Sequence, residues 1–280
     1  MKENTLDSVK NEFLDIYSAI CDLSDNEILN GPDDIFRPHF ERLHRLAAMD
    51  VDDQTAEEIL RDREFRSAAK HICHLKAVNG LRMEIESAQS IIARPDPWAP
   101  VKRFVFYPNY VELARMEYQG ANLKPGDTVV FLGSGPLPLS LICLCKQYGV
   151  RGIGIEQVSE YAKLSKKLIE VLELTGHIRI VQGNHFSLPI EDECRLVMVG
   201  ADARPKDEVF TYLAKALPDG TRVSYRIYEK GLRRLLDDQS VLELPPEFKE
   251  YSRVRPEPPV NNTSVFLVKN SVPSNAFSHH

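Results

Sequence analysis

The sequence has few cysteines, and their arrangement argues against a disulfide framework. There are five in 280 residues, an odd number with irregular spacing. Such a set is typical of reduced thiols. Cys143 and Cys145 resemble a pair, but residues two apart on a helix point to nearly opposite sides, so we interpret both as core thiols.

A basic excess, a long apolar run and a signal sequence are also missing. The net charge of −6 argues against nucleic acid as the main partner. No apolar stretch approaches the roughly 20 residues that a membrane-spanning helix needs. The start, MKENTLDSVKNEF, carries charges where a signal peptide has its apolar core. We therefore expect a cytoplasmic globular protein with no membrane partner.

The first hundred residues show the apolar period of helices. One stripe repeats every three or four residues and comprises Leu6, Val9, Phe13, Ile16, Ile20 and Leu23. Gly31-Pro32-Asp33 interrupts the pattern, which then continues to Met49. Thr55 and Glu58 have the spacing of a capping box, with Thr55 as the expected N-cap. A long helix, broken once, should follow to about Ile92, where prolines stop it.

From Asp127 onward, strand-like and helix-like segments alternate. The expected strands cover residues 127–133, 151–156, 177–182, 195–201, 221–227 and 263–269, and a helix is expected near Lys206–Ala216. This alternation predicts an α/β fold with a mostly parallel sheet. We predict an N-terminal helical bundle domain (1–100), a Rossmann-like sheet of the class I methyltransferase type (101–270) and a disordered tail (271–280).

The first strand ends in a glycine–proline turn. Gly133, Ser134, Gly135, Pro136 and Leu137 lie between a good strand and a good helix, where glycines let the backbone approach a ligand closely. We predict that this turn binds a nucleoside cofactor.

Three other strand ends should meet the same ligand. Glu156 ends the second strand, where an acid accepts ribose hydroxyls, and Gln157 follows it. The segment Gly183-Asn184-His185 should meet the adenine edge, although His185 alone is compatible with an ordinary loop histidine. We also assign Gly200-Ala201, at the end of the fourth strand, to this site.

The cofactor is either NAD or S-adenosylmethionine, and three features favour the second. A proline stands where the third glycine of a dinucleotide site usually lies, and no second nucleotide-binding turn is evident. The sheet should also end in a late strand, near Thr263–Lys269, as methyltransferase-like sheets often do.

One acid falls on the apolar stripe of the long helix. Glu84 lies between Leu81 and Ala88, whereas Glu86 lies nearly opposite and is expected in solvent. Burial of an acid is costly unless it is paired or functional, and burial would raise its pKa, which suits a general base or an ammonium binder. The alternative is a structural salt bridge, for example with Arg82 or Arg103.

Two tyrosines and a histidine pair complete the candidates. Tyr107 and Tyr110 flank a proline in the segment that joins the two halves, where ligand sites are common, although aromatic core is the more usual interpretation of such a cluster. His71 and His74 share a helical face but lack a third ligand at zinc spacing, so we interpret them as structural.

Together these motifs resemble the nicotianamine synthases and the related enzymes that make opine-type metallophores of the staphylopine and pseudopaline kind. The resemblance covers roughly residues 35–270. It rests on VVFLGSGPLPLS (129–140), NGLRMEIESAQ (79–89), PW (97–98), FYPNY (106–110), SYR (224–226) and VNNTSV (260–265).

The resemblance implies a reaction. An amine attacks the Cγ of the co-substrate S-adenosylmethionine, the 3-amino-3-carboxypropyl group moves and methylthioadenosine leaves, with no metal required. Glu84 would hold or deprotonate the amine, with Tyr107 and Tyr110 around it. Tyr225, Arg226 and Asn262 would line the substrate pocket. The acceptor would be histidine, glutamate or aminobutyrate, and the product would be a metallophore. The sequence leaves open whether the protein forms a homodimer.

Three other functions remain. The chain resembles a small-molecule methyltransferase in its expected fold, and such an enzyme would release S-adenosylhomocysteine. A non-catalytic protein would bind S-adenosylmethionine without turnover. A dehydrogenase would bind NADH.

Overall fold

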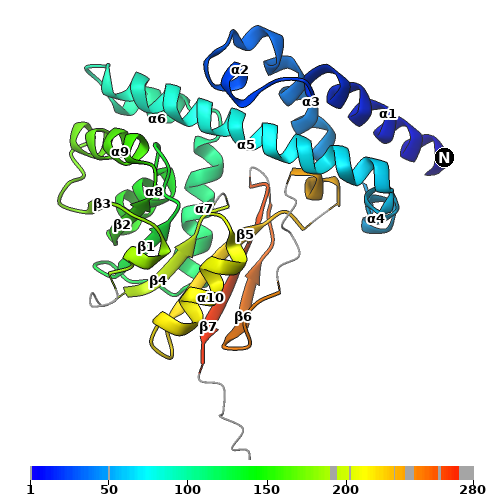
Figure 1. Cartoon of the computed structure of the whole chain (residues 1–280). Helices are drawn as coiled ribbons and strands as arrows, with labels where there is room; N and C mark the ends of the chain where they lie inside the picture. Colours follow the sequence, from blue (N-terminus) through cyan, green and yellow to red (C-terminus); the bar gives the residue numbers. More distant parts are fainter. Residues whose placement is uncertain are drawn as a thin grey trace, which may run out of the picture.

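The computed structural model describes residues 2–49, 51–189, 194–201, 203–229, 231–236, 243–257 and 260–270. It consists of a helical part and a sheet flanked by helices (Figure 1). The expected tail, residues 271–280, lies outside the described residues.

The N-terminal half is helical, as predicted. Its elements are α1 (Lys2–Ile20), α2 (Asp25–Asn30), η1 (Asp33–Ile35), α3 (Arg37–Ala47), α4 (Asp53–Arg61) and α5 (Arg63–Ile92). The apolar stripe of α1 packs against the other helices in one core that contains Phe13, Leu43, Ile59 and Ile72. The pattern with a period near 3.6 residues therefore predicts both the helices and the faces that they bury.

The predicted N-cap of α4 is wrong. Asp52 is the N-cap, and its side chain accepts a hydrogen bond from the backbone N–H of Thr55 at 3.0 Å. Thr55 lies inside the first turn, where its hydroxyl donates to the same carboxylate at 2.8 Å. Aspartate caps at least as well as threonine, and it comes three residues earlier, so the helix starts there. The single break predicted in the long helix is present at Asp62, between α4 and α5.

The second half is an α/β fold with the predicted class I methyltransferase-type sheet. The seven strands have the order β3-β2-β1-β4-β5-β7-β6, and only β7 pairs antiparallel with its two neighbours. The strands are β1 (Thr128–Leu132), β2 (Arg151–Glu156), β3 (Ile178–Gln182), β4 (Cys194–Val199), β5 (Arg222–Ile227), β6 (Phe248–Val254) and β7 (Thr263–Lys269). The other elements are α6 (Trp98–Arg103), α7 (Tyr107–Gly120), α8 (Leu139–Tyr148), α9 (Ser159–Val171), η2 (His185–Ser187), α10 (Lys206–Ala216) and η3 (Gly231–Leu236).

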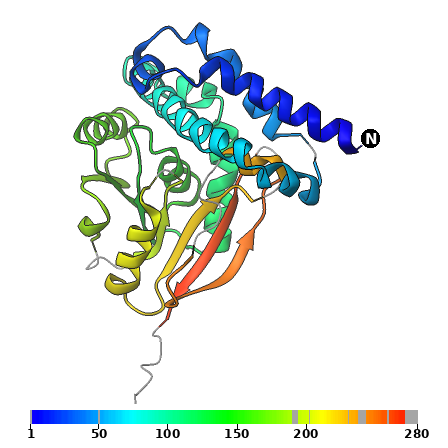
Figure 2. The same ribbon diagram turned by 45° about the vertical axis from the view of Figure 1, so that its right-hand side comes forward.

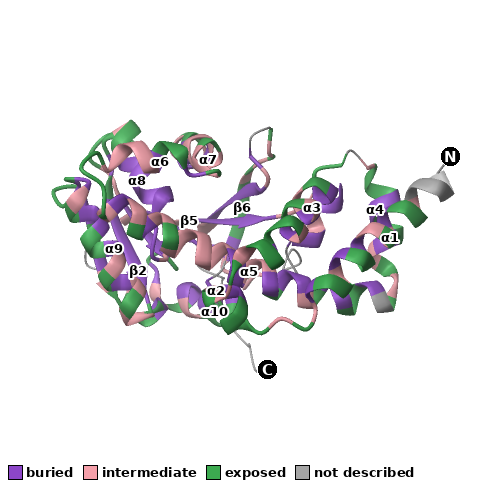
Figure 3. Ribbon diagram, turned by 90° about the horizontal axis from the view of Figure 1, so that it is seen from above, coloured by how far each residue is buried: buried purple, intermediate pink, exposed green. Residues whose placement is uncertain are grey.

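Strand β6 is the strand that the sequence did not predict, and helices α6 and α7 in the joining segment were not predicted either. Phe248 is the one buried residue of β6, and all of the others are exposed or intermediate. The interior strand β2, by contrast, is buried from its second residue to its last (Figure 3). A polar strand at the sheet edge lacks the apolar alternation by which a half-buried strand is identified.

Alternate strand residues face two different helical layers. On one face, Val129 and Phe131 pack with helices α7, α8 and α9. On the other face, Val130 and Leu132 pack with α10. Because side chains alternate along a strand, neighbouring residues of β5 are likewise divided between the two layers.

The helical half and the sheet half complete each other's cores. Leu232, Leu235 and Leu236 of η3, which follows β5, are buried in the helical core. In the other direction, Ala88 and Ile91 near the end of α5 belong to the core of the sheet. Figures 1 and 2 both show α5 lying across the ends of the strands. The two units proposed from the sequence, 1–100 and 101–270, are therefore in close contact through segments of both.

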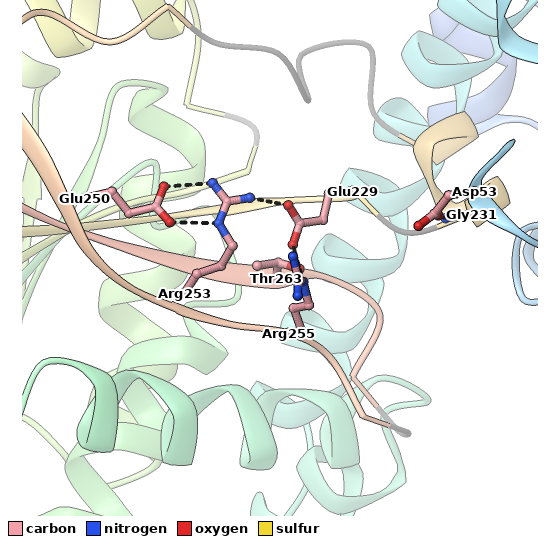
Figure 4. Close-up of polar contacts among 7 residues, drawn as sticks. All are labelled: Asp53, Glu229, Gly231, Glu250, Arg253, Arg255 and Thr263. Carbon is pink, nitrogen blue, oxygen red and sulfur yellow. Dashed lines mark hydrogen bonds and ion pairs between the residues drawn. The ribbon is translucent and has the colours of Figure 1, made fainter. Parts of the chain in front are cut away.

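Polar contacts fix the chain where it leaves β5 (Figure 4). Glu229 accepts a hydrogen bond from the Thr263 hydroxyl at 3.0 Å and pairs with Arg253 and, at 3.4 Å, with Arg255. Arg253 also pairs with Glu250 at 2.7 Å. These contacts tie the residues after β5 to β6, to the segment that follows β6 and to β7.

Candidate active site

The glycine–proline turn requires glycine at two positions. Gly133 and Gly135 have φ values of +73° and +69°, in the left-handed region that favours glycine. The backbone N–H groups of Gly133 and Ser134 both donate to the carbonyl of Ile155, at 3.0 and 3.1 Å. The turn is thereby fastened to strand β2.

Glu156 holds the turn from the neighbouring strand. One carboxylate oxygen accepts from the Gly135 N–H at 3.0 Å, and the other accepts from the Val158 N–H at 2.8 Å. Glu156 is buried. A carboxylate has about four acceptor positions, so capacity remains for ligand hydroxyls beyond these two bonds. Glu156 therefore shapes the turn and keeps acceptor capacity at the cavity wall.

Three aromatic side chains gather where the chain leaves strand β3. Asn184 caps η2 by accepting from the Phe186 N–H at 3.0 Å. The His185 ring lies 4.1 Å from that of Phe186 and 5.4 Å from that of Tyr212, between centroids. His185 is buried and its Nε2 atom has no hydrogen-bond partner among the described residues, although Glu208 approaches to 3.5 Å. The Nε2 atom itself is covered, and the Glu208 carboxylate is the nearest polar group that the structure gives it.

The helical half places an acid against the turn. The Oε2 atom of Glu84, on α5, lies 2.8 Å from the point where a β-carbon would stand on Gly135. Glu84 is half-buried. Arg82 pairs with Glu86 at 2.6 Å and also donates to the carbonyl of Ile28 at 2.9 Å. From the sequence we considered a salt bridge between Glu84 and Arg82. In the structure Arg82 forms its salt bridge with Glu86 instead.

A cavity of about 520 Å³ lies between α5 and the carboxyl ends of the strands. Most of the residues that we predicted for the site line it. These are Glu84, Tyr110, Gly133, Ser134, Gly135, Pro136, Leu137, Glu156, Gln157, Gly183, Asn184, His185, Gly200, Ala201, Arg226 and Asn262.

Tyr107 and Tyr225 are not among the described residues that line this cavity. Tyr225 faces the α10 layer, where its ring lies 5.3 Å from that of Phe210. Arg226 faces the opposite layer, because neighbouring strand residues point to opposite faces. Tyr107 packs against the core that contains α7 and α8, and burial raises its pKa. The structure does not support the prediction that Tyr225 lines the pocket.

Arg226 is held by a buried acid that the sequence analysis missed. Its Nε atom donates to Glu117 of α7 at 3.3 Å, and its Nη1 atom donates to the Ser140 hydroxyl at 3.0 Å. The Ser264 hydroxyl donates to the same Glu117 oxygen at 3.3 Å. Glu117 is 1% exposed, so the ion pair between Arg226 and Glu117 is buried beneath the surface of the cavity. Its position next to Leu113, Ala114 and Met116, on the buried side of α7, was the available signal.

The helical side of the cavity was also missed. It is lined by His44, Lys76, Asn79, Phe106, Tyr228 and Leu236, among others. Burial, with the nearby charge of Lys76, lowers the pKa of His44 to about 4, so its imidazole is neutral near pH 7. Asn79 and Phe106 lie in the motifs 79–89 and 106–110, whereas His44, Lys76, Tyr228 and Leu236 come from distant parts of the chain and belong to none of the quoted motifs.

The other candidates have structural roles. His71 contacts the Tyr17 hydroxyl at 3.3 Å, and His74 contacts Asp25 at 2.7 Å, so the two imidazoles bind α5 to α1 and α2. Cys143 and Cys145 are buried free thiols, and burial raises the pKa of each to about 12. Within the described ranges, no group of three or more His, Cys, Asp and Glu side chains is placed to bind a metal ion. In the same part of the chain, no helix has the length and apolar character of a membrane span.

Three solved structures of MtNAS are similar to this chain over nearly all of both lengths. A glutamate-to-glutamine variant in complex with S-adenosylmethionine has 29% sequence identity and a TM-score of 0.80, covering 93% of this chain and 98% of that one. A complex with MTA and tNA has 28% identity and a TM-score of 0.79, covering 97% and 99%. A further structure of the same glutamate-to-glutamine variant has 29% identity and a TM-score of 0.81, covering 95% of this chain and 98% of that one.

Comparison with curated proteins found no match. A family model described as nicotianamine synthase protein matches residues 2–274, almost the whole chain. The predicted resemblance and the predicted fold are confirmed, and this chain belongs to the nicotianamine synthase family.

Proposed function

We propose that this protein transfers the 3-amino-3-carboxypropyl group of S-adenosylmethionine to the amine of an amino-acid acceptor and releases methylthioadenosine. The observation that carries the proposal is the position of Glu84, whose carboxylate lies against Gly135 of the glycine–proline turn. An acid in that position lies beside the reactive end of a nucleoside ligand bound by the turn. The relatives crystallised with S-adenosylmethionine, MTA and tNA support the same chemistry.

The residues around the turn fit S-adenosylmethionine. The volume of about 520 Å³ lies within the range of small-molecule sites. Ser134 Oγ and His185 Nε2 are buried and have no hydrogen-bond partner among the described residues, as expected for groups that a ligand satisfies. In this proposal Glu156 accepts the ribose hydroxyls, and Asn184 and His185 meet the adenine. The turn (Gly133–Leu137), Gln157, Gly183, Gly200 and Ala201 enclose the nucleoside.

Bound S-adenosylmethionine supplies a carbon that its sulfonium already activates. The protein then has to position an amine and keep it neutral, because a protonated amine is not nucleophilic. We assign the binding and deprotonation of that amine to Glu84. Tyr110 lines the same cavity, while Tyr107 supports it from the core. Arg226 and Asn262, also in the wall, are assigned to the carboxylate of a substrate.

The finer parts of the proposal concern the product and its setting. Aminobutyrate groups joined through amines make a chain of nitrogen and carboxylate ligands, which suits transition metals. We therefore propose a metallophore or opine-precursor product, formed without a catalytic metal on histidine, glutamate or aminobutyrate in the cytoplasm.

The test is incubation with S-adenosylmethionine and a panel of amino acids, with products read by mass. We expect one acceptor to gain an aminobutyrate unit, with methylthioadenosine in equal amount. Release of S-adenosylhomocysteine would instead identify a methyltransferase. Tight cofactor binding with no product from any acceptor would identify a non-catalytic binding protein.

A further inference from the structure

The chain that leaves β5 is attached first to the sheet (Figure 4). The Glu229 carboxylate accepts a hydrogen bond from the Thr263 hydroxyl of β7 at 3.0 Å and pairs with Arg253 of β6. The side chain of Glu229 is 20% exposed, so this ion pair is partly shielded from water and salt. Glu229 therefore ties the chain to two strands just before it crosses to the other half.

The same stretch of chain is then attached to the helical half. The backbone N–H of Gly231 donates to the Asp53 carboxylate of α4 at 3.1 Å. Three leucines of η3 are buried in the helical core, namely Leu232, Leu235 and Leu236. We call Glu229 together with residues 231–236 the strap, because this segment leads from the sheet to the helical half.

The strap supports the middle of helix α5. The Cys73 thiol donates to the carbonyl of Leu235 at 3.1 Å, and the Lys76 ammonium donates to the carbonyl of Leu236 at 3.4 Å. These partners are 162 and 160 positions apart in the chain, so the contacts are purely tertiary. The middle of α5 therefore rests on η3 and, through Glu229, on the sheet.

Glu84 lies between this support and a second one. Lys76, on the strap, is roughly two helical turns before Glu84. Ala88 and Ile91, roughly one to two turns after it, are buried in the core of the sheet. A helix held on both sides of Glu84 presents that carboxylate to Gly135 at a defined distance.

Resting on the transfer function proposed above, we propose that Glu229 is a positioning residue for that reaction. Its contacts with Arg253 and Thr263 keep the strap, and with it the middle of α5, at a fixed height above the sheet, so that Glu84 stays against the turn. Loss of those contacts lets α5 tilt about its anchored end near Ile91, which moves the Glu84 carboxylate and leaves the turn unchanged. A misplacement of about 1 Å can cost roughly 100-fold in rate.

Glu229→Ala tests the position of Glu84 through the rate of transfer in single turnovers, read as methylthioadenosine formed. We expect this rate to fall about tenfold or more, while the dissociation constant for S-adenosylmethionine changes by less than about threefold, because the turn belongs to the sheet half. In the Glu84→Gln background, Glu229→Ala should cost less than about twofold, since the group that it positions is already absent. A loss of equal size in both backgrounds would show a general structural role and overturn the inference.

The matched control is Lys269→Gln, at the opposite end of β7 from Thr263. Lys269 pairs with Asp219 at 2.7 Å and its side chain is 13% exposed, so an ion pair of similar burial is removed from the same sheet. Thermal melting should show comparable losses of stability in both variants, but Lys269→Gln should keep the transfer rate; a tenfold loss there would contradict the assignment. If Glu229→Ala does not fold, Glu229→Gln takes its place, and an unchanged rate in that variant overturns the inference.

Hydrogen exchange measures the support of α5 without turnover. The backbone amides of residues 73–84 should exchange about fivefold faster in Glu229→Ala than in the unsubstituted protein, whereas those of α10 should not change. Unchanged exchange in α5 would overturn the inference even if the rate falls. If no acceptor yields methylthioadenosine with the unsubstituted protein, the transfer function fails, and the exchange still decides whether Glu229 supports α5.

Discussion

A carboxylate oxygen of Glu84 lies 2.8 Å from the point at which Gly135 would carry a β-carbon. The helical half and the cofactor turn are therefore in contact at this position, and a β-carbon on Gly135 would require the Glu84 carboxylate to move. The contact places a candidate base beside the turn that we assign to the nucleoside.

Replacement of Glu84 by glutamine should remove most of the turnover. The amide keeps the shape but takes up no proton, and loss of a general base typically costs 100-fold or more in rate. We expect the dissociation constant for S-adenosylmethionine, measured by calorimetry, to change by less than about threefold. Glu86→Gln, on the exposed side of the same helix, is the matched control. Near-normal turnover in Glu84→Gln would exclude this acid from the mechanism.

Gly135→Ala should reduce transfer activity for a local reason, by displacing the Glu84 carboxylate. A β-carbon there meets the Glu84 carboxylate, and the φ of +69° is strained for alanine. Gly126→Ala is the control, because its φ of +88° is equally strained while its β-carbon meets no described atom within 4 Å. Both should lose about 1–2 kcal/mol of stability by thermal melting. Only Gly135→Ala should lose transfer activity; a similar loss in both variants would assign the effect to strain alone.

Glu156→Gln should weaken S-adenosylmethionine binding by about 10- to 100-fold. The amide nitrogen cannot accept a hydrogen bond, so one of the two N–H groups, of Gly135 or Val158, loses its acceptor. Titration calorimetry measures the affinity, and Glu160→Gln at the exposed start of α9 serves as the reference. Unchanged affinity in Glu156→Gln would show that the turn keeps its shape without this carboxylate and that the ribose is bound elsewhere.

The buried pair of Arg226 and Glu117 should show strong coupling in stability. Arg226→Met leaves the Glu117 carboxylate, 1% exposed, without its cation, and we expect a loss of about 3–5 kcal/mol in urea denaturation. The double variant with Glu117→Leu should lose less than Arg226→Met alone, because no buried charge remains. Additive losses would mean that the two side chains do not depend on each other.

Mild acid should destabilise the protein through His44. Burial and the charge of Lys76 lower its pKa from 6.5 to about 4 in the folded chain. The unfolded chain binds the proton first, so this contribution to stability is complete above pH 6.5 and is lost as the pH falls toward 4.

From pH 7 to pH 5 this group should lower the free energy of unfolding by up to about 2 kcal/mol. Denaturation in urea at each pH measures the change. His44→Gln should remove that part of the pH dependence, whereas His177→Gln at an exposed position should keep it. Identical pH profiles for the unsubstituted protein and His44→Gln would contradict the assignment.

Much of the fold follows from local patterns. The glycine–proline turn lies between a strand and a helix, and the six predicted strands are present. The elements missed or displaced have local reasons too. Strand β6 is polar because it lies at an edge, and Asp52 rather than Thr55 caps α4 because the aspartate comes first.

Some residues of the site could be predicted from local sequence and others could not. Glu84 and the glycine turn stand out because an acid on an apolar stripe and glycines at a strand end are unusual in themselves. Tyr225 was wrongly assigned to the pocket because the motif SYR does not say which of its residues faces which helical layer. Glu117 was missed because its partner Arg226 is 109 residues away.

The sequence by itself determined six of the strands and most of the helices, the glycine–proline turn between a strand and a helix, and the acid on the apolar stripe of α5. Those features depend on side-chain period and backbone sterics, which act over a few residues. Only the tertiary structure decided that this acid meets that turn, and that His44, Lys76 and Tyr228 share one cavity. Such contacts join residues far apart in the chain, and packing of the two cores, rather than any local preference, brings them together.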